Sequence, residues 1–426
     1  MADKLGSIKN ELITKLKGKG FVEIIFSTTL VKAIMFLSAM FLPRFLTKPD
    51  YGSLSYAETM VNYYLLLSGL GMNQAALKFC VAEKDPEKKK GIFGATLAIG
   101  TLFNLVAAAV FIVIIYFTRF DIPDSRRLTF SMVGIPFFSF IFQDFQFYLR
   151  AHFMNRKYSI VSLVYTILYV SAQILLAILV GVYGVVFARY FAYPICIGLC
   201  IYFAREFVSI KFKWPSKAMI KKIIVFSIAL LMGSFFSQMV LNNESLFIGR
   251  YFKDSEVVAN FKVATCFIQI CVFFVDAVAV FIIPYFAKNS NNPKWLYTNF
   301  KKIYFYIMIF MTVVILFLML TSKWIVLLVW GENYLSGVKM VRMLLIAAWC
   351  QTALRAIPMH VLAFVGEEKY LVVVHILTCV VHAVTDYFIF NNLGGDFIGA
   401  GLIVAYFVSG LGMTIKAWHK LYRGIK

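Results

Sequence analysis

Long apolar runs separated by short polar breaks follow one another from residue 21 to near the end of the chain. About 20 apolar residues are needed for a helix to cross the hydrocarbon core of a bilayer, and these runs have that length. The pattern therefore predicts about twelve membrane-spanning helices. We place them at 21–42, 53–80, 91–117, 129–153, 159–180, 184–204, 222–248, 256–286, 298–321, 335–364, 369–390 and 397–418.

The composition supports this class of fold. Apolar residues make up 61% of the chain and charged residues 15%, whereas soluble domains are about half apolar and a quarter charged. The sequence thus predicts an all-α, polytopic membrane protein with no sizeable soluble domain. No P-loop, GxSxG or HExxH motif occurs, and the 7 cysteines form no CxxC pair. We therefore expect neither an enzyme nor a bound metal or cofactor.

Lysine and arginine are distributed unevenly between alternating connections. If the N-terminus is cytoplasmic, roughly 27 of them fall on the cytoplasmic side and about 8 on the other side. Because cytoplasmic loops carry the excess of cations, we expect both termini in the cytoplasm. The formal charge of +21 then reflects orientation and contact with anionic membrane lipid, and no nucleic acid partner is expected.

The largest basic connection lies at the midpoint of the chain and separates two sets of six predicted spans. A shift of 206 residues (from Arg44 to Arg250) also brings Thr59 onto Thr265, which suggests an internal repeat. We expect two six-helix lobes that are parallel repeats. The predicted segments are a lead-in 1–20, a lobe 21–204, a linker 205–221, a lobe 222–418 and a tail 419–426.

Ionisable residues inside the apolar spans are the candidates for function. Each costs about 3 kcal/mol at the bilayer centre unless it faces water or a partner, although some residues near helix ends extend to the membrane surface instead. The acidic candidates are Glu58, Asp144, Glu244 and Asp276, and the basic ones are Lys32, Arg189, Lys262 and Arg355. His375, His382 and Asp386 form one helical stripe, which either relays protons or holds a structural pair in which Asp386 accepts from His382.

Four turn motifs resemble those of Wzx-type polysaccharide flippases, which belong to the multidrug/oligosaccharidyl-lipid/polysaccharide exporter superfamily. These motifs are Asp50-Tyr51-Gly52 with Gly69-Leu70-Gly71, the segment 242–265, Trp330-Gly331-Glu332 with Tyr334, and Gly395 with Ile398-Gly399-Ala400. The second motif departs from the family, which often has Asp at the place of Asn243 or Glu244 and Gly-Tyr at the place of Ala259-Asn260.

The resemblance implies two lobes around a central cavity, through which alternating access moves undecaprenyl-diphosphate-linked oligosaccharide from the inner to the outer leaflet of a bacterial plasma membrane. Lys32, Lys262, Arg355 and Arg189 are then the expected phosphate-binding cations. Side chains that could bond sugar hydroxyls are Asn62, Gln238, Asn242 and Gln269. Glu58, Asp144, Glu244 and Asp276 would balance the cations or bind H⁺ or Na⁺ for coupling.

Two other functions fit part of the same pattern. A cation-coupled multidrug exporter of the same superfamily would favour an acidic, aromatic cavity, whereas the intramembrane charges here are mixed. A polymerase of lipid-linked sugars would also span the membrane many times, but the predicted outer loops are short. For the flippase we expect a monomer, with a polysaccharide polymerase and chain-length proteins as partners.

Overall fold

In the computed structural model, residues 21–208, 213–289 and 292–423 are described, and every regular element in them is a helix. The predicted all-α fold is confirmed. Eleven helical segments of these residues are long and apolar enough to cross a membrane. The predicted span 222–248 is not among the eleven, but it is helical as part of α10 (Lys217–Phe252). The predicted lead-in 1–20 lies outside the described residues.

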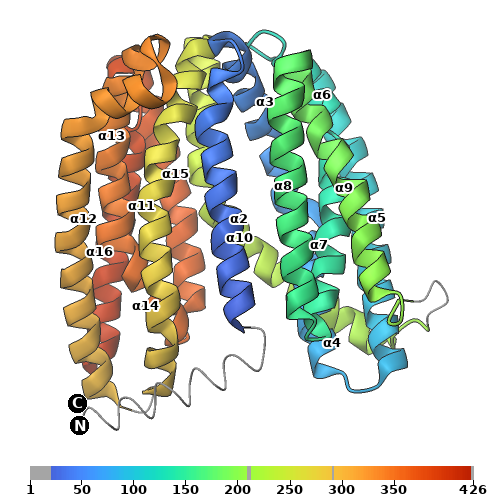
Figure 1. Cartoon of the computed structure of the whole chain (residues 1–426). Coiled ribbons are helices and arrows are strands. Elements are labelled where there is room, and N and C mark those ends of the chain that lie inside the picture. Colours follow the sequence, from blue (N-terminus) through green and yellow to red (C-terminus); the bar gives the residue numbers. More distant parts are fainter. Residues whose placement is uncertain (1–20, 209–212, 290–291, 424–426) are drawn as a thin grey trace. The chain divides into compact units, whose positions relative to one another are not determined.

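The helices follow the predicted order along the chain (Figure 1). In the first half they are α2 (Phe21–Phe41), α3 (Lys48–Leu67), α4 (Met72–Ala82), α5 (Pro86–Phe117), α6 (Ser125–Ser131), α7 (Ile135–Ala151), α8 (Asn155–Val180) and α9 (Val182–Ala204). After α10 come α11 (Ser255–Lys288), α12 (Pro293–Trp330), α13 (Val338–Trp349), α14 (Ile357–Phe364), α15 (Glu368–Asn392) and α16 (Ala400–Arg423). Short 3₁₀ turns lie at Leu42–Arg44, Ser68–Gly71, Glu332–Gly337 and Gly395–Phe397.

Helix ends coincide with local sequence signals. The Asp85 carboxylate accepts a hydrogen bond from the Glu87 N–H at 2.9 Å, and Pro86 is the first residue of α5. The Asn292 side chain caps α12 in the same way. Both arrangements satisfy an amide that the helix itself leaves unpaired.

Three predicted spans are interrupted. The span 53–80 is broken by the turn Ser68–Gly71, where Gly69, Leu70 and Gly71 all have positive φ (62°, 52° and 72°). The span 129–153 is divided between α6 and α7. The span 335–364 contains a π-helical turn, Cys350–Ala356, between α13 and α14. Such turns within α-helices are often found at functional sites.

Contacts divide the chain into two compact units. The first unit comprises Met1–Leu46, Val61–Arg119 and Arg126–Leu231, and the second comprises Thr47–Met60, Phe120–Ser125 and Met232–Lys426. Helices α3 and α10 therefore each contribute residues to both units.

The first unit is built on α2, α4, α5, α7, α8 and α9. Helix α2 packs along α8, where the Ser27 hydroxyl donates to the Ser159 hydroxyl at 2.9 Å. The stacked rings of Phe93 and Tyr148, with centroids 3.9 Å apart, fill the space between α5 and α7. Such polar pairs and ring stacks fix the register of helices whose outer surfaces are equally apolar.

In the second unit α13, the π-helical turn and α16 lie next to one another, and α11 and α12 pack on α13. The Trp349 indole N–H donates to the Thr312 hydroxyl at 2.8 Å. On α12, the side chains of Leu320 and Leu328 are 80% and 78% exposed. In a lipid environment such exposure carries no hydrophobic penalty, so α12 presents the surface expected of a membrane-embedded helix.

Candidate functional site

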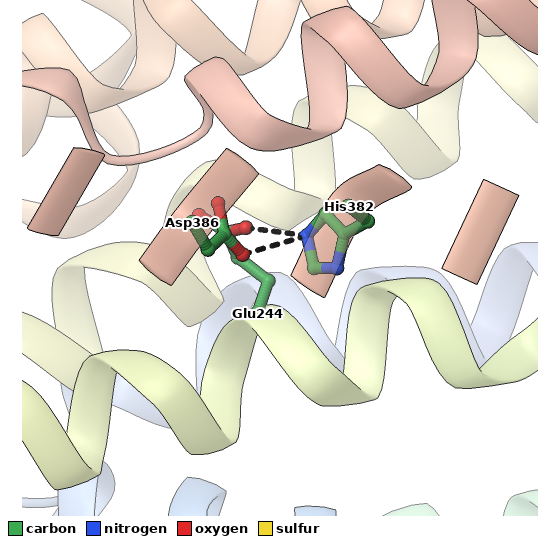
Figure 2. A group of neighbouring side chains, drawn as sticks. All are labelled: Glu244, His382 and Asp386. Atoms are coloured by element: carbon green, nitrogen blue, oxygen red, sulfur yellow. Dashed lines mark hydrogen bonds and ion pairs between the residues drawn. The ribbon is translucent and has the colours of Figure 1, made fainter. Parts of the chain in front are cut away.

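Three ionisable side chains meet in the interior of the second unit (Figure 2). His382 Nε2 lies 2.7 Å from Glu244 Oε2 and 2.9 Å from Asp386 Oδ2. Glu244 comes from α10, while His382 and Asp386 are one turn apart on α15. The exposed fraction of all three side chains is 0–1%. We call Glu244, His382 and Asp386 the buried triad.

The start of α16 closes the buried triad from a third side. The Gly399 N–H donates to Glu244 Oε1 at 2.8 Å, and Gly399 has a φ of 93°, which favours glycine. A Cβ at Gly401 would lie 1.9 Å from Asp386 Oδ1. Gly401 therefore lets the backbone of α16 approach Asp386 more closely than a side chain would allow, and Gly399 supplies its N–H to Glu244 from a conformation that favours glycine.

The buried triad is the one group among the described residues whose side chains could hold a metal ion, with ligand atoms within 4.8 Å of one another. Nε2 lies within hydrogen-bond distance of both carboxylate oxygens. Only its contact with Glu244 Oε2 is a hydrogen bond, because Asp386 Oδ2 has no hydrogen-bond partner among the described residues.

A second buried cluster surrounds Arg355 on the π-helical turn. Its guanidinium Nη2 lies 2.7 Å from His375 Nδ1, and its guanidinium carbon lies 5.3 Å from the centre of the Tyr406 ring. Arg355 is 5% exposed, and in the described part of the chain no carboxylate forms an ion pair with it. Its charge is thus held by an imidazole lone pair and an aromatic face.

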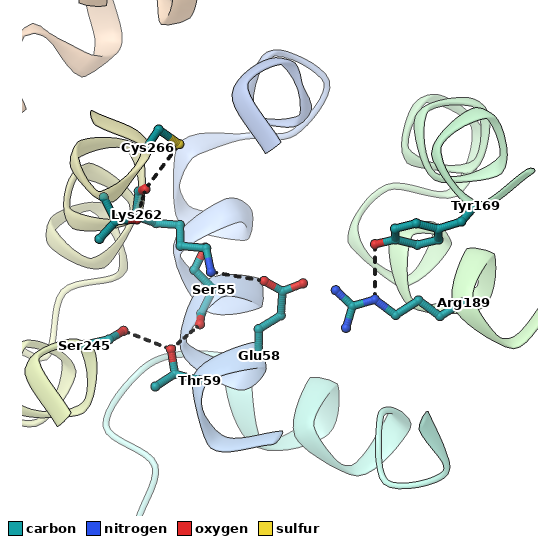
Figure 3. Close-up of polar contacts among 9 residues, drawn as sticks. Ser55, Glu58, Thr59, Tyr169, Arg189, Ser245, Lys262 and Cys266 are labelled. Carbon is teal, nitrogen blue, oxygen red and sulfur yellow. Dashed lines mark hydrogen bonds and ion pairs between the residues drawn. The ribbon is translucent and has the colours of Figure 1, made fainter. Parts of the chain in front are cut away.

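A partly exposed ion pair joins α3 and α11 within the second unit (Figure 3). Lys262 Nζ lies 3.5 Å from Glu58 Oε2, and the two side chains are 30% and 16% exposed. One residue along α3, Thr59 donates to the Ser55 carbonyl at 2.9 Å and lies 3.0 Å from the Ser245 hydroxyl. Polar contacts thus follow one face of α3 near the start of a predicted span.

The first unit holds two further charged candidates. Arg189 Nε on α9 donates to the Tyr169 hydroxyl at 3.2 Å, and its guanidinium carbon lies 5.7 Å from the centre of the same ring (Figure 3). Asp144 on α7 is 0% exposed, and neither of its carboxylate oxygens has a hydrogen-bond partner among the described residues. Asp144 is therefore enclosed by the helices of this unit, whereas Arg189 is held by an aromatic partner.

The other predicted site residues are dispersed. Lys32 is exposed on α2, and Asn62 is half-buried on α3. Gln238 and Gln269 are exposed on α10 and α11, and Asn242 is half-buried on α10. Asp276 Oδ1 lies 3.8 Å from His360 Nε2, beside an apolar pocket between α11 and α14. The roles predicted for these residues remain predictions.

Some residues of these clusters have no signal in the sequence pattern. Tyr169, Tyr406 and Ser245 lie in apolar runs and are reached only by folding. Gly399 and Gly401 stand out in the sequence at most as part of a turn motif, and their contact with the carboxylates depends on close packing of three helices. By contrast, the one-turn spacing of His382 and Asp386 is sufficient to predict their pairing.

A family model described as "Polysaccharide biosynthesis protein" matches residues 41–339, which is more than half of the chain. The chain belongs to this polysaccharide biosynthesis family. The resemblance to polysaccharide flippases of the MOP superfamily is thereby confirmed. No curated protein matches the chain.

Solved structures of MATE transporters share the fold of this family member. A multidrug resistance MATE family transporter of the MOP superfamily, in an inward-facing conformation, aligns with a TM-score of 0.74 and 13% identity over 95% of this chain and 99% of that chain. A point mutant of the Vibrio cholerae MATE transporter VcmN aligns with a TM-score of 0.64 and 12% identity, over 97% of this chain and 98% of that chain. A MOP superfamily transporter from Pyrococcus furiosus aligns with a TM-score of 0.60 and 13% identity, over 96% of this chain and 96% of that chain.

At these identities the likeness concerns the fold alone. Together with the family and the eleven candidate spans, it identifies the protein as a multi-pass membrane transporter of the MOP superfamily.

Proposed function

We propose that this transporter moves undecaprenyl-diphosphate-linked oligosaccharide from the inner to the outer leaflet of a bacterial plasma membrane by alternating access. The observation that carries the proposal is membership of a polysaccharide biosynthesis family in a chain with a transporter fold. A diphosphate with a sugar headgroup cannot cross about 30 Å of hydrocarbon unaided. It requires a polar path with cations for the phosphates and amides for the sugar.

The pair Glu58–Lys262 is the best candidate for a phosphate contact. Lys262 is 30% exposed, so its ammonium is accessible, and its partner Glu58 lies at 3.5 Å, which is a loose ion pair. A diphosphate carries more charge than one carboxylate and would displace Glu58 as the counterion of Lys262. Arg355, Arg189 and Lys32 are the other proposed cations, and Asn62, Gln238, Asn242 and Gln269 are the proposed contacts to sugar hydroxyls.

Transport of a labelled lipid-linked oligosaccharide tests the proposal directly. Purified protein is reconstituted into vesicles, and the fraction of headgroups that a membrane-impermeant sugar oxidant reaches is followed with time. We expect faster loss of protection than in protein-free vesicles, and slower loss in a Lys262→Ala variant of equal abundance. Equal rates with and without the wild-type protein would overturn the flippase function.

A multidrug exporter is the second candidate, since the MATE structures that share the fold include a protein named for multidrug resistance. The same vesicles loaded with a cationic dye separate the two functions. Dye efflux without oligosaccharide translocation would establish drug export instead. Extension of the oligosaccharide by the purified protein would reveal a polymerase.

In the cell, we propose that both termini face the cytoplasm and that the protein acts as a monomer beside a polysaccharide polymerase and chain-length proteins. The excess of Lys and Arg in the predicted cytoplasmic connections supports this orientation. Single cysteines added at the two ends of a cysteine-free variant should be labelled by an impermeant maleimide only after the membrane is opened. Labelling of intact cells would contradict the orientation.

A further inference from the structure

The turn that joins α7 to α8 in the first unit carries a residue that its backbone conformation disfavours. The Met154 N–H donates to the Leu149 carbonyl at 3.0 Å. The Phe153 N–H donates to the Arg150 carbonyl at 2.9 Å, and together these bonds close the end of α7. In this pattern the residue at the position of Phe153 is left-handed and is usually glycine. Phe153 has a φ of 57°, so the turn accepts a strain that glycine would remove.

The second unit builds the same kind of turn with glycine, between α14 and α15. The Glu367 N–H donates to the Leu362 carbonyl at 3.0 Å. The Gly366 N–H donates to the Ala363 carbonyl at 3.4 Å, and Gly366 has a φ of 80°. The backbone geometry of such a turn therefore does not require an aromatic residue, and the reason for Phe153 lies in the contacts of its side chain.

Phe153 gains little from packing within the protein. It is 73% exposed. The preceding residue, His152, occupies the inner side of the turn, where its ring centre lies 4.3 Å from that of Phe207 and 4.5 Å from that of Tyr148. Burial of an aromatic ring is what normally offsets backbone strain. For Phe153 the compensating contact must therefore come from outside the protein.

The position of the turn identifies the surroundings of Phe153. Residues Ser125–Ala151 and Asn155–Val180 are both candidate membrane spans, and only three residues join them. Three residues extend over at most about 10 Å, and this connection must also return to the bilayer. The headgroup layer is about 5–8 Å thick on each side of the hydrocarbon core. Phe153 accordingly lies at the level of the lipid headgroups, where aromatic side chains are enriched.

Three cations surround Phe153 without an acidic residue beside them. Arg150 lies in the last turn of α7, and Arg156 and Lys157 lie in the first turn of α8. Residues 145–205 contain no Asp or Glu. In the part of the chain that the structure describes, no carboxylate forms an ion pair with any of the three cations. The turn thus combines an exposed ring with an uncompensated positive charge.

The cations are held at the protein surface by aromatic faces. The Arg150 guanidinium carbon lies 5.3 Å from the centre of the Tyr158 ring, and Lys157 Nζ lies 5.6 Å from the centre of the Phe203 ring. Arg156 is exposed, and the other two cations are half-buried. Their aliphatic stems cover apolar surface at the helix ends, while the charged groups stay within reach of the headgroup layer.

The glycine turn of the second unit lacks both features. It carries Glu367, whose carboxylate lies 2.7 Å from Lys420 Nζ and 3.4 Å from Lys416 Nζ. The cations next to that turn are thus compensated within the protein, and no bulky residue stands at the left-handed position. Strain, exposure and unbalanced charge coincide at the first turn and not at the second.

We propose that Arg150, Phe153, Arg156 and Lys157, which we call the basic turn, form a binding site for an anionic phospholipid. The ring of Phe153 enters the boundary between headgroups and acyl chains, and the cations bind the lipid phosphate. In the orientation proposed above, this lipid belongs to the inner leaflet. A soluble acidic protein fits less well, because so short a connection stays within the headgroup layer. The inference is independent of the substrate that is transported.

Native mass spectrometry of the purified full chain tests the lipid preference. Phosphatidylglycerol and phosphatidylcholine are added in equal amounts, and we expect the first phosphatidylglycerol to bind about fivefold more tightly or better. A triple variant with Gln at all three cations of the basic turn should lose most of this preference. The control Lys294→Gln, Lys301→Gln and Lys302→Gln removes three exposed cations from α12 and should retain it. No preference in the wild type, or equal preference in both triple variants, would overturn the proposal.

Phe153→Gly separates a lipid contact from a structural role. The substitution removes the strain, so in detergent without anionic lipid the variant should unfold at the wild-type temperature or above it. Its preference for phosphatidylglycerol should fall several-fold. The matched change in the second unit, Gly366→Ala, should instead lower the unfolding temperature, because a φ of 80° disfavours alanine. A less stable Phe153→Gly, or one with unchanged lipid preference, would show that Phe153 is structural and remove it from the site.

The lipid carrier of the proposed substrate shares the anionic chemistry of the phospholipid. Undecaprenyl diphosphate added in equal amount should leave phosphatidylglycerol on the basic turn, and it should bind equally to the wild type and to the triple variant of that turn. Displacement of the phospholipid, or loss of carrier binding in the triple variant, would assign the basic turn to the substrate and overturn the proposal. Normal lipid binding of the triple variant with loss of a co-purifying membrane protein would assign the turn to a protein partner and likewise overturn it.

Discussion

The second unit contains two clusters of opposite charges that differ in access to solvent. Glu244, His382 and Asp386 are enclosed at 0–1% exposure and meet at 2.7–2.9 Å, while Glu58 and Lys262 are partly exposed and lie 3.5 Å apart. In the enclosed cluster the partners that the described residues provide are the other cluster members and a backbone N–H. In the open pair each charge can exchange its partner for water or for a ligand.

The comparison indicates a division of roles. A fixed, dry cluster determines how helices pack, because any change in its charge is felt at the full desolvation cost. A loose, wet pair contributes little to stability but is available to a substrate. Substitutions that act on stability should therefore concentrate in the buried triad, and substitutions that act on transport alone should concentrate at Lys262.

The largest effect on stability is expected from Glu244→Ala. It leaves the Gly399 N–H unpaired and removes one of two carboxylates from His382, so we expect a loss of about 3–5 kcal/mol. The matched change in the open pair, Glu58→Ala, should cost about 1 kcal/mol or less. Thermal unfolding of both purified variants in detergent measures the difference. Equal shifts of the unfolding temperature would remove the distinction between the two clusters.

A smaller loss is expected from Gly401→Ala. The added Cβ would lie 1.9 Å from Asp386 Oδ1, so the carboxylate or α16 must move, at a cost of about 1–3 kcal/mol. Gly198→Ala on α9 is the control, since a Cβ there meets nothing within 4 Å. The control should be unchanged or slightly more stable. If the two variants unfold at the same temperature, the triad is not closed by α16.

The open pair is tested by transport rather than by stability. Lys262→Ala should slow oligosaccharide translocation about tenfold, which corresponds to the loss of one charge-assisted contact, with unfolding nearly unchanged. The exchange Glu58→Lys with Lys262→Glu retains an ion pair between α3 and α11 but moves the cation. It should therefore unfold like the wild type and still transport poorly. Recovery of transport in the exchanged variant would show that Lys262 is structural.

Arg355 and Lys262 are both proposed to bind substrate, but they differ in burial in the same way as the two clusters do. Arg355→Ala is predicted to impair export as well, but Arg355 is 5% exposed and its guanidinium contacts His375 and Tyr406. We therefore expect Arg355→Ala to lower the unfolding temperature together with export, whereas Lys262→Ala lowers export alone. Normal unfolding of Arg355→Ala with reduced export would assign the guanidinium to the substrate instead.

Hydropathy is sufficient to predict the helices, because lipid imposes the length and the apolar character of each span. The one-turn spacing of His382 and Asp386 likewise predicts a local pair. The partner Glu244 lies 138 residues from His382 along the chain. Their contact could not be predicted, because the spacing of apolar residues within each span does not indicate which spans are neighbours in the fold. The sequence does not predict the π-helical turn at Cys350–Ala356 either, since its residues are all compatible with an ordinary α-helix.

The smallest effect is expected outside the spans, at Glu367 between α14 and α15. Its carboxylate accepts from Lys420 at 2.7 Å and lies 3.4 Å from Lys416. The hydrogen bond from Lys420, supported by the charges of both lysines, lowers the pKa of Glu367. A carboxyl whose pKa falls on folding stabilises the protein above its unfolded pKa and loses that contribution as the pH decreases through the folded value.

Glu367→Gln should consequently lower the unfolding temperature only slightly at pH 7, because solvent screens a partly exposed pair. The gap between variant and wild type should close further on acidification, as the wild-type carboxyl takes up its proton. Unfolding of both proteins across the acid range measures this convergence. A difference in unfolding temperature that widens toward low pH would have the wrong sign for a carboxylate paired with lysines. A difference as large as that caused by Glu244→Ala would mean that surface charge, rather than burial, determines which ion pairs stabilise this fold.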